Sequence, residues 1–203
     1  MNLKSLIRTV PDFPSPGIRF RDITPLLAHP PAMRHITKEL AKRFEGRVDK
    51  VAAIEARGFL FGATIAHAIG AGVIPVRKPG KLPFTTIGHD YALEYGTNRV
   101  ELHTDAVARG DRVLVVDDLL ATGGTARAAL GLLDRLGATV IGCAFVIELL
   151  GLEGRARLEG QDVHALVSFA QTACARLALQ AVRDLAQDLD VRMIRPEAVP
   201  PFF

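Results

Sequence analysis

Short apolar blocks and helical repeats of apolar residues alternate along this chain. Residues 113–116 are four aliphatic residues in a row, a pattern typical of a strand that is buried on both faces of a sheet. Between Met33 and Phe44, apolar residues recur every three or four positions, which predicts an amphipathic helix over residues 30–44. Because strands and helices alternate in this way, we expect an α/β fold, a mainly parallel twisted sheet flanked by helices on both faces.

The same pattern predicts the remaining elements. The predicted strands are residues 48–54, 73–76, 99–102, 113–116, 139–147 and 163–168, and the predicted helices are residues 30–44, 59–69 and 126–136. Gly70 follows the second of these helices and is expected to end it. Residues 78–98 form a long polar segment that contains Gly and Pro, in which residues 84–87 and 91–94 are expected to pair as a hairpin.

A chain of 203 residues most simply forms one domain. We place that domain at residues 1–170, with an N-terminal segment over residues 1–29 and the long polar segment at residues 78–98. Residues 171–203 form a C-terminal extension, in which residues 173–189 carry a helical apolar pattern. Because such a pattern gives a helix one apolar face, we expect the extension to pack on the same domain.

Composition and charge narrow the class of protein. Hydrophobic residues make up 49% of the chain and charged residues 23%, which is ordinary for a soluble globular protein. The net charge of +3 helps to attract a polyanionic substrate, but Lys and Arg do not cluster with aromatic residues as they do in nucleic-acid-binding proteins. We see neither a signal peptide nor an apolar run of the roughly 18 residues that span a bilayer. We therefore expect a cytoplasmic protein that binds neither nucleic acid nor a membrane.

The most informative segment follows the strand at residues 113–116. After it come Asp117 and Asp118, then a loop rich in Thr and Gly, and then a helix. Ligands of open α/β sheets bind beyond the carboxyl ends of the strands, so these polar residues lie where a ligand is expected. Glycines let the loop turn sharply, its successive N–H groups form an anion-binding concavity, and the following helix adds its positive end. We therefore predict a phosphate site at Ala121, Thr122, Gly123, Gly124 and Thr125.

The two carboxylates suit a different part of the ligand. Asp117 and Asp118 cannot hold the phosphate itself, because like charges repel. Carboxylates accept hydrogen bonds from the vicinal hydroxyls of a sugar, and they also stabilise Mg²⁺ or a developing positive charge. A phosphate pocket beside an acidic pair therefore indicates a sugar phosphate.

Three other ligand-binding motifs fit this chain less well. A Walker loop requires a Lys, and this loop has none. A dinucleotide fingerprint would need a third glycine where Pro75 stands after Gly70 and Gly72, and a strand rather than a helix follows. A phospho-receiver site uses an acidic pair but does not need the Thr-Gly-Gly-Thr loop. The remaining alternative is a plain strand–turn–helix connection with a solvated acidic pair.

Residues 117–125 resemble the phosphoribosyl-diphosphate signature of type I phosphoribosyltransferases, and the Leu-Leu-Ala inside them resembles the adenine phosphoribosyltransferases. Further segments are similar to that family in order and spacing, and they are residues 16–24, 54–59, 77–83 and 91–96. The resemblance runs from about residue 6 to about residue 169. It implies the type I phosphoribosyltransferase fold, with a flexible lid hairpin, and a role in purine salvage.

The resemblance also implies the reaction. The 5-phosphoribosyl group of 5-phospho-α-D-ribose 1-diphosphate, here called phosphoribosyl diphosphate, would pass to adenine through an oxocarbenium-like transition state. The products would be AMP and diphosphate. Mg²⁺ would be held mainly through substrate and water, as its strict octahedral geometry favours, and we assign it no direct protein ligand. The family further implies a homodimer.

Cations at the same edge of the sheet fit the diphosphate. Arg57 lies between a predicted strand and a predicted helix, where a guanidinium can donate two hydrogen bonds to phosphate oxygens. The alternative is that Arg57 forms a surface ion pair with Glu55. Taken alone, a basic cluster such as the one at residues 77–81 is typical of a solvated face. The resemblance implies that these cations bind the diphosphate, partly across a dimer interface, and they are Arg57, Arg77, Lys78 and Lys81.

The base-binding residues follow from the resemblance. Adenine would lie between Phe20 and Leu149, and its amino edge would meet the backbone of Arg19 and Arg21. Arg19 departs from the aliphatic residue common at that position. This change alters the base preference only if the Arg19 side chain enters the pocket.

The catalytic residues implied by the family come from the lid and the acidic pair. Glu94, which stands with Tyr95 in the lid, would assist proton transfer at adenine. Asp117 and Asp118 would hold the ribose hydroxyls and stabilise charge at C1. Closing the lid would exclude water from the oxocarbenium-like transition state.

Two alternatives stay open on the sequence alone. A 6-oxopurine phosphoribosyltransferase, for hypoxanthine or xanthine, commonly reads the exocyclic oxygen with a Lys side chain, and we find no convincing candidate near residues 145–150. A regulator of the same fold, which senses phosphoribosyl diphosphate and contacts DNA, usually carries an added helix-turn-helix. Residues 171–203 show one helical pattern rather than two.

Overall fold

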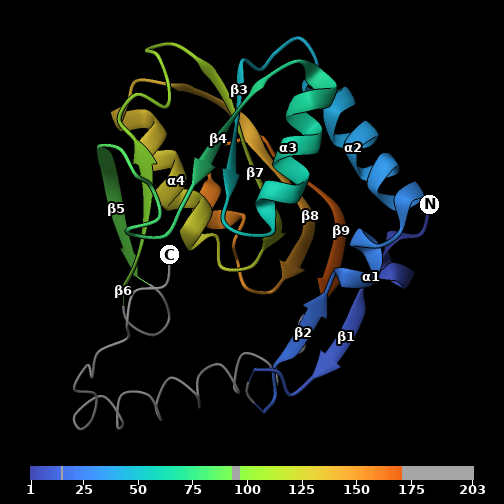
Figure 1. The fold of residues 1–203 in the computed structure, drawn as a ribbon. Helices are drawn as coiled ribbons and strands as arrows, with labels where there is room; N and C mark the ends of the chain where they lie inside the picture. Colours follow the sequence, from blue (N-terminus) through green and yellow to red (C-terminus); the bar gives the residue numbers. More distant parts are fainter. Residues whose placement is uncertain (15, 93–96, 171–203) are drawn as a thin grey trace, which may run out of the picture.

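The computed structural model describes residues 1–14, 16–92 and 97–170, and among them a five-stranded sheet forms the centre of the molecule (Figure 1). Its strands, in their spatial order, are β4 (Gly72–Val76), β3 (Lys50–Ile54), β7 (Arg112–Leu120), β8 (Thr139–Leu150) and β9 (Val163–Ala170). Each strand runs parallel to its neighbours, so the expected parallel sheet is confirmed. The lid residues Glu94 and Tyr95 and the extension at residues 171–203 lie outside the described residues.

Helices cover both faces of this sheet, as the alternation of elements predicted. The helices are α1 (Thr24–Leu27), α2 (Pro30–Phe44) and α3 (Gly58–Ile69) on one side and α4 (Gly124–Arg135) on the other (Figure 1). The predicted bounds of α2 are confirmed, and Gly70 ends α3 with a left-handed φ of 70°. In the described part of the chain, no helix is long and apolar enough to cross a membrane.

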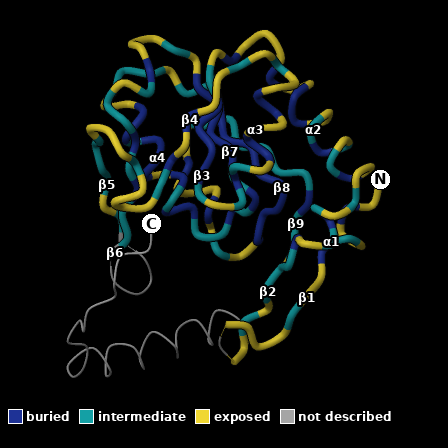
Figure 2. Tube along the Cα trace, in the orientation of Figure 1, coloured by how far each residue is buried: buried dark blue, intermediate teal, exposed yellow. Residues whose placement is uncertain are grey.

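The side chains of β7 alternate between two hydrophobic cores. Leu114 and Val116 pack under α2 and α3, whereas Val113 and Val115 pack under α4. All four are fully buried, and Figure 2 shows the central strands as a buried layer between more exposed helices. A strand covered on both faces needs apolar residues at every position, which explains the aliphatic run that predicted it.

Two antiparallel pairs lie outside the central sheet. β1 (Arg8–Pro11) pairs with β2 (Arg19–Asp22) near the end of β9, and β5 (Thr86–Ala92) pairs with β6 (Thr97–His103) beside α4 (Figure 1). Two short 3-10 helices, η1 (Leu3–Leu6) and η2 (Ala156–Leu158), stand before β1 and before β9.

The predicted pairing of residues 84–87 with residues 91–94 is wrong. Residues 86–87 and residues 91–92 lie on the same strand, β5, whose partner β6 contains the strand predicted at residues 99–102, while residues 93–94 lie outside the described residues. The reason is that the two-residue period of β5 continues through its polar positions, so that Ile87, His89 and Tyr91 share one face. Ile87 and Tyr91 pack against the core under α4, and the His89 ring lies against the same helix.

β7 extends beyond the apolar block that predicted it. Asp117 and Asp118 lie inside the strand rather than after it, because β8 continues alongside them. The register pairs Asp117 with Phe145, and the ladder then runs on to Leu120, the end of β7, which lies opposite Glu148. Backbone hydrogen bonding, not the polarity of the side chains, decides where this strand ends.

Candidate functional site

The acidic pair lies near the carboxyl end of β7, and its two side chains point to opposite faces of the strand. Asp118 is 4% exposed; Asp117 is half-buried, and its Oδ1 accepts a hydrogen bond of 2.8 Å from the backbone N–H of Asp118. Gly58, the first residue of α3, lies against Asp117: a Cβ there would be 2.9 Å from Asp117 Oδ1 and 2.9 Å from Val116 O. The glycine therefore lets the start of α3 approach the carboxylates closely.

Burial shifts both carboxylates towards the protonated form. It raises the pKa of Asp117 well above its ordinary value, and the nearby charge of Asp118 adds to that rise. Burial also raises the pKa of Asp118, against the opposing charge of Arg57. A hydroxyl donor or a positive charge that reached this pair would relieve part of the cost of its burial.

Arg57 connects the acidic pair to the N-terminal segment. Its Nε lies 2.7 Å from Asp118 Oδ2, and its guanidinium carbon lies 5.5 Å from the centre of the Phe20 ring. The alternative pairing of Arg57 with Glu55 is therefore wrong. β3 lies between β4 and β7, so residues that follow β3 reach partners on either side.

Glu55 instead holds the basic cluster that follows β4. Glu55 Oε2 accepts hydrogen bonds from Arg77 Nε at 3.1 Å and from the Lys78 N–H at 3.0 Å, and Arg77 Nη1 donates to Lys81 O at 2.8 Å. Burial would raise the pKa of Glu55, but these hydrogen bonds and the two positive charges outweigh it and lower the pKa. The Arg77 side chain thus links Glu55 to the backbone of Lys81, while the side chains of Lys78 and Lys81 are exposed.

The predicted phosphate loop turns from β7 into α4. Gly123 has a left-handed φ of 77°, and a Cβ on it would lie 2.5 Å from Gly154 O, so both the turn and its packing require glycine here. α4 begins at Gly124, which directs the first backbone N–H groups of the helix into the loop. A loop that leads into a helix N-terminus in this way is the geometry on which the predicted phosphate site rests.

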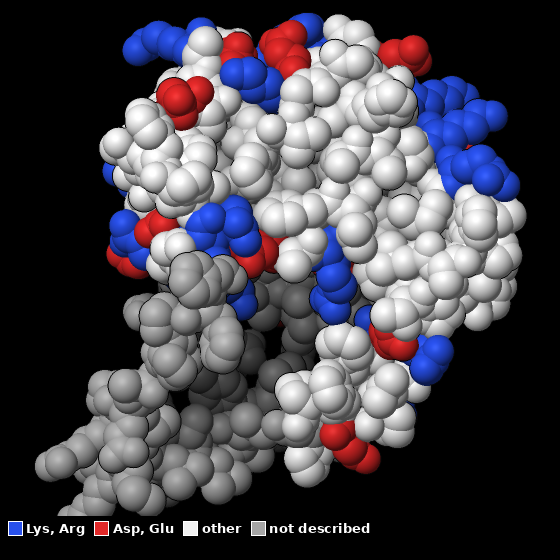
Figure 3. Space-filling model, viewed as in Figure 1, with Lys and Arg blue, Asp and Glu red and all other residues white. Residues whose placement is uncertain are grey.

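Two adjoining cavities lie at this edge of the sheet. One, of about 370 Å³, is lined by the acidic pair and the residues after β3; the other, of about 70 Å³, is lined by the phosphate loop. They share Asp117 and Leu119, so a ligand in the loop would extend towards Asp117 and Arg57. Figure 3 shows basic and acidic side chains side by side along the lower edge of the main body.

The residues expected at the base are placed by β2 and β8. Phe20 lies on β2 and packs edge to face on Phe13, with the ring centres 5.1 Å apart. Arg21 stacks on Phe169 at 4.1 Å, and Phe169 stands next to the buried Leu149 in the register of β8 and β9. The Arg21 side chain therefore anchors β2 to the central sheet, while Phe20 faces Arg57.

The structure adds contacts that sequence reasoning missed. Tyr91 Oη lies 3.0 Å from Thr125 Oγ1, so β5 touches the phosphate loop. Arg155 makes two hydrogen bonds, of 3.0 and 2.6 Å, to the buried Glu148 and holds the loop that carries Gly154. In the sequence, the one indication of this second loop, which follows β8, is that Gly154 stands directly before Arg155. Among the described residues, no group of three or more His, Cys, Asp or Glu side chains is arranged to hold a metal ion.

Comparisons with known proteins find relatives over most of the chain. The phosphoribosyl transferase domain family matches residues 22–181. The adenine phosphoribosyltransferase of Parvibaculum lavamentivorans is 57% identical over 167 residues, which are 82% of this chain and 95% of that protein.

Solved structures show the same relationship. The adenine phosphoribosyltransferase of Thermoanaerobacter pseudethanolicus superposes with a TM-score of 0.80 at 51% identity, covering 82% of this chain and 98% of that one. The Saccharomyces cerevisiae enzyme, in complex with an imino-altritol bisphosphate and adenine, gives a TM-score of 0.76 at 40% identity and covers 81% and 96% of the two chains.

Proposed function

This chain belongs to the phosphoribosyltransferase family, and we propose that it acts as an adenine phosphoribosyltransferase. A bond forms between N9 of adenine and C1 of the ribose, the bond from C1 to the diphosphate oxygen breaks, and the N9 proton is lost. The observation that carries the proposal is the acidic pair placed between a phosphate loop and Arg57, in two cavities that adjoin.

The phosphate loop would hold the 5′-phosphate. Its backbone N–H groups, the hydroxyls of Thr122 and Thr125, and the positive end of α4 all suit an anion. The ribose would then extend into the larger cavity, where Asp117 and Asp118 accept hydrogen bonds from its hydroxyls and stabilise positive charge at C1.

Arg57 would change partner when substrate binds. In the structure it pairs with Asp118, and the diphosphate offers it stronger, bidentate acceptors. Its transfer to the diphosphate would release Asp118 for the ribose. Lys78 and Lys81, which are exposed, would add charge to the same leaving group.

The base would bind next to the ribose, on the side of β2. Phe20 offers a ring face for stacking, and the backbone of Arg19 and Arg21 would read the amino edge of adenine. Leu149 would close the opposite side. We keep the roles of Glu94 in proton transfer and of Tyr95 in the lid as proposals from the family resemblance.

Mg²⁺ fits this site through oxygen donors. The carboxylates of Asp117 and Asp118 line the larger cavity, and hard oxygen donors are what Mg²⁺ prefers. We propose that the substrate and water supply most of its ligands, with these carboxylates contacting its waters. When bound, the ion would neutralise the developing charge of the diphosphate.

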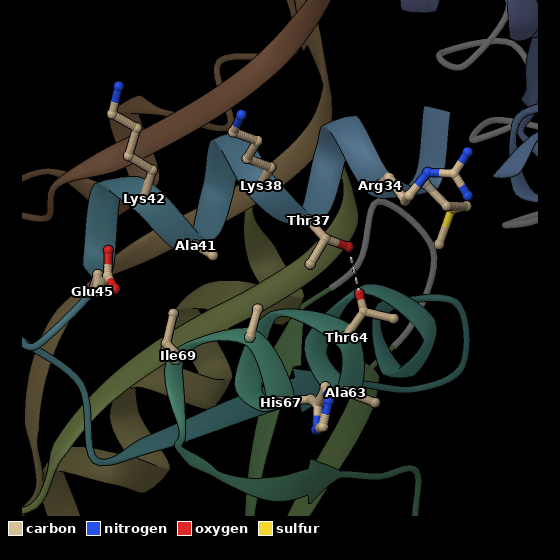
Figure 4. Close-up of a pocket in the computed structure, with 12 residues that line it drawn as sticks. Arg34, Thr37, Lys38, Ala41, Lys42, Glu45, Ala63, Thr64, His67 and Ile69 are labelled. Carbon is tan, nitrogen blue, oxygen red and sulfur yellow. Dashed lines mark hydrogen bonds between the residues drawn. The ribbon is translucent and has the colours of Figure 1, made fainter. Parts of the chain in front are cut away.

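A homodimer would bury the groove between α2 and α3. This groove has a volume of about 890 Å³ and includes Ala41, Ala63 and Ala68; Thr37 and Thr64 hydrogen-bond across it at 3.1 Å (Figure 4). On the same face of α3, Leu60 is 47% exposed one turn before Thr64. We propose that a second copy covers this face, because a broad apolar surface is costly to leave in water.

The proposed reaction is tested by offering one nucleobase at a time. Purified protein is mixed with Mg²⁺, phosphoribosyl diphosphate and adenine, hypoxanthine, guanine or xanthine, and each nucleotide is quantified. We expect AMP to dominate. A dominant 6-oxopurine product would overturn the base assignment, and binding of phosphoribosyl diphosphate without turnover of any base would favour the regulator.

The proposed dimer is tested by analytical ultracentrifugation of the wild type and of Leu60→Asp. A charge at Leu60 should shift the equilibrium towards monomer if α3 lies in the interface. A wild type that sediments as a monomer at micromolar concentration would contradict the proposal.

A further inference from the structure

Tyr91 brings β5 to the phosphate loop. Its hydroxyl lies 3.0 Å from Thr125 Oγ1, and its ring lies against the start of α4, since a Cβ on Gly124 would be 3.3 Å from Tyr91 Cδ2. Thr125 is one of the residues whose hydroxyl suits a phosphate. The phenol therefore stands within hydrogen-bonding range of a group that binds the anion.

β5 is fixed along α4 up to this point. Arg135, near the end of α4, donates a hydrogen bond of 2.9 Å to Gly88 O. The His89 ring then packs on Gly131, where a Cβ would come within 2.8 Å of it. Tyr91 is the next residue on that face of β5, and it lies at the start of α4. The strand thus runs antiparallel to the helix and ends its contact at the phosphate loop.

Arg157 reaches the same turn of α4 from η2. Its Nη1 would lie 3.7 Å from a Cβ on Gly124. The segment that carries it is fixed by the ion pair of Arg155 with Glu148. The phosphate loop at residues 121–125 contains no Lys or Arg, so its positive potential comes from backbone dipoles. A guanidinium beside Gly124 would add a full charge.

We infer that Tyr91 and Arg157 complete the 5′-phosphate site from outside the loop. This inference rests on the proposed function and adds two residues to it. The Tyr91 hydroxyl would donate to a phosphate oxygen instead of Thr125, and Arg157 would pair with the same phosphate.

The test compares two ligands that would bind different parts of the proposed active site, only one of which carries the 5′-phosphate. Ribose 5-phosphate carries the 5′-phosphate, whereas diphosphate with Mg²⁺ occupies the leaving-group side. Calorimetry measures both affinities in the wild type, Tyr91→Phe and Arg157→Gln. Arg109→Gln is the matched control, because Arg109 packs beside Gly137, just beyond the opposite end of α4. Tyr91→Phe keeps the ring that packs on Gly124, so the fold is preserved.

We expect each variant to weaken ribose 5-phosphate by about tenfold, the loss that a hydrogen bond to a charged group corresponds to. Diphosphate affinity should stay unchanged, as should both affinities in Arg109→Gln. In turnover, KM for phosphoribosyl diphosphate should rise while kcat is retained. Equal weakening of both ligands, or no weakening, would overturn the inference. A wild type that does not bind ribose 5-phosphate would instead overturn the proposed function.

Discussion

Asp118 has Arg57 as its ion-pair partner, and this contact determines what a neutral replacement does. Asp118→Asn should lower kcat with adenine by an amount equivalent to about 2–4 kcal/mol in barrier, because the carboxylate stabilises charge at C1. The fold should persist, since the Arg57 side chain is 39% exposed and can be hydrated when its partner is lost. Steady-state turnover and a thermal melt measure the two effects.

Asp134→Asn provides the control for that substitution, since Asp134 is exposed on α4, away from the acidic pair. It should change neither turnover nor melting temperature. Near-normal turnover in Asp118→Asn would remove Asp118 from the proposed chemistry.

Asp117 should make the protein less stable as pH rises. Burial, reinforced by the charge of Asp118, raises its pKa in the folded protein, so the folded state holds the proton more tightly than the unfolded chain. The free energy of unfolding should therefore fall between the ordinary Asp pKa of about 4 and the raised value, by up to about 1.4 kcal/mol for each pH unit of that window.

Asp117→Asn should weaken that dependence, since Asp118 with its own raised pKa remains, and it should raise stability at neutral pH while turnover falls. Asn keeps an oxygen that accepts the hydrogen bond from the Asp118 N–H, so the local backbone should hold. Urea titrations at several pH values measure the effect. An unfolding free energy that rises with pH over this window in the wild type, and does so equally in the variant, would contradict the assignment.

Single residues were predictable where neighbours in the chain are also neighbours in space. The acidic pair and the phosphate loop are contiguous in the sequence, so the sequence pattern alone predicted them. The partners of Arg57 and Glu55 were not, because β3 lies between two strands that are distant in sequence. Glu55 pairs with Arg77, which follows β4, and Arg57 pairs with Asp118 on β7. These pairings depend on the order of the strands in the sheet.

At the scale of elements, the phosphate loop depends on a second loop that follows β8. A Cβ on Gly154 would lie 2.2 Å from Ala121 O, so this glycine lets the two loops pack directly. Gly154→Ala should push the phosphate loop out of place. We expect a stability loss of about 1–3 kcal/mol, together with a higher KM for phosphoribosyl diphosphate, measured by urea unfolding and initial rates.

Gly72→Ala is the matched control, since a Cβ there would have its nearest neighbour at 3.7 Å, an ordinary contact. It should leave KM unchanged. If Gly154→Ala changed neither stability nor KM, the loop after β8 would be free to relax without moving the phosphate loop.

Element boundaries show why local pattern is a partial guide. The apolar block at residues 113–116 predicted a strand that continues for four more residues, because β8 supplies hydrogen-bond partners beyond it. The sequence pattern predicted two short strands where β5 is one, because Gly88 and Asp90 interrupt the run of apolar residues in the sequence. In the structure those residues point away from α4, and the alternation is continuous.

At the scale of the molecule, the layered architecture followed from alternation alone. Parallel strands joined through helices bury both faces of the sheet, and the two cores on either side of β7 match that expectation. The positions of the β1–β2 and β5–β6 pairs did not follow. They are fixed by contacts such as Arg21 on Phe169 and Arg135 with Gly88, which join segments far apart in the chain.

The extension at residues 171–203 gives the last prediction. Every described residue that we place in the site lies before residue 170, and the Parvibaculum lavamentivorans relative covers 82% of this chain while matching 95% of its own length. A chain ending at Ala170 should therefore retain KM and kcat with adenine. It should melt lower, by about 2–4 °C for each kcal/mol of lost packing, because the sequence pattern of residues 173–189 predicts a helix with one apolar face. A second chain ending at Ala181, where the family match ends, separates family-shared residues from the rest. Loss of turnover in a well-folded chain ending at Ala170 would show that the extension contributes to the site itself.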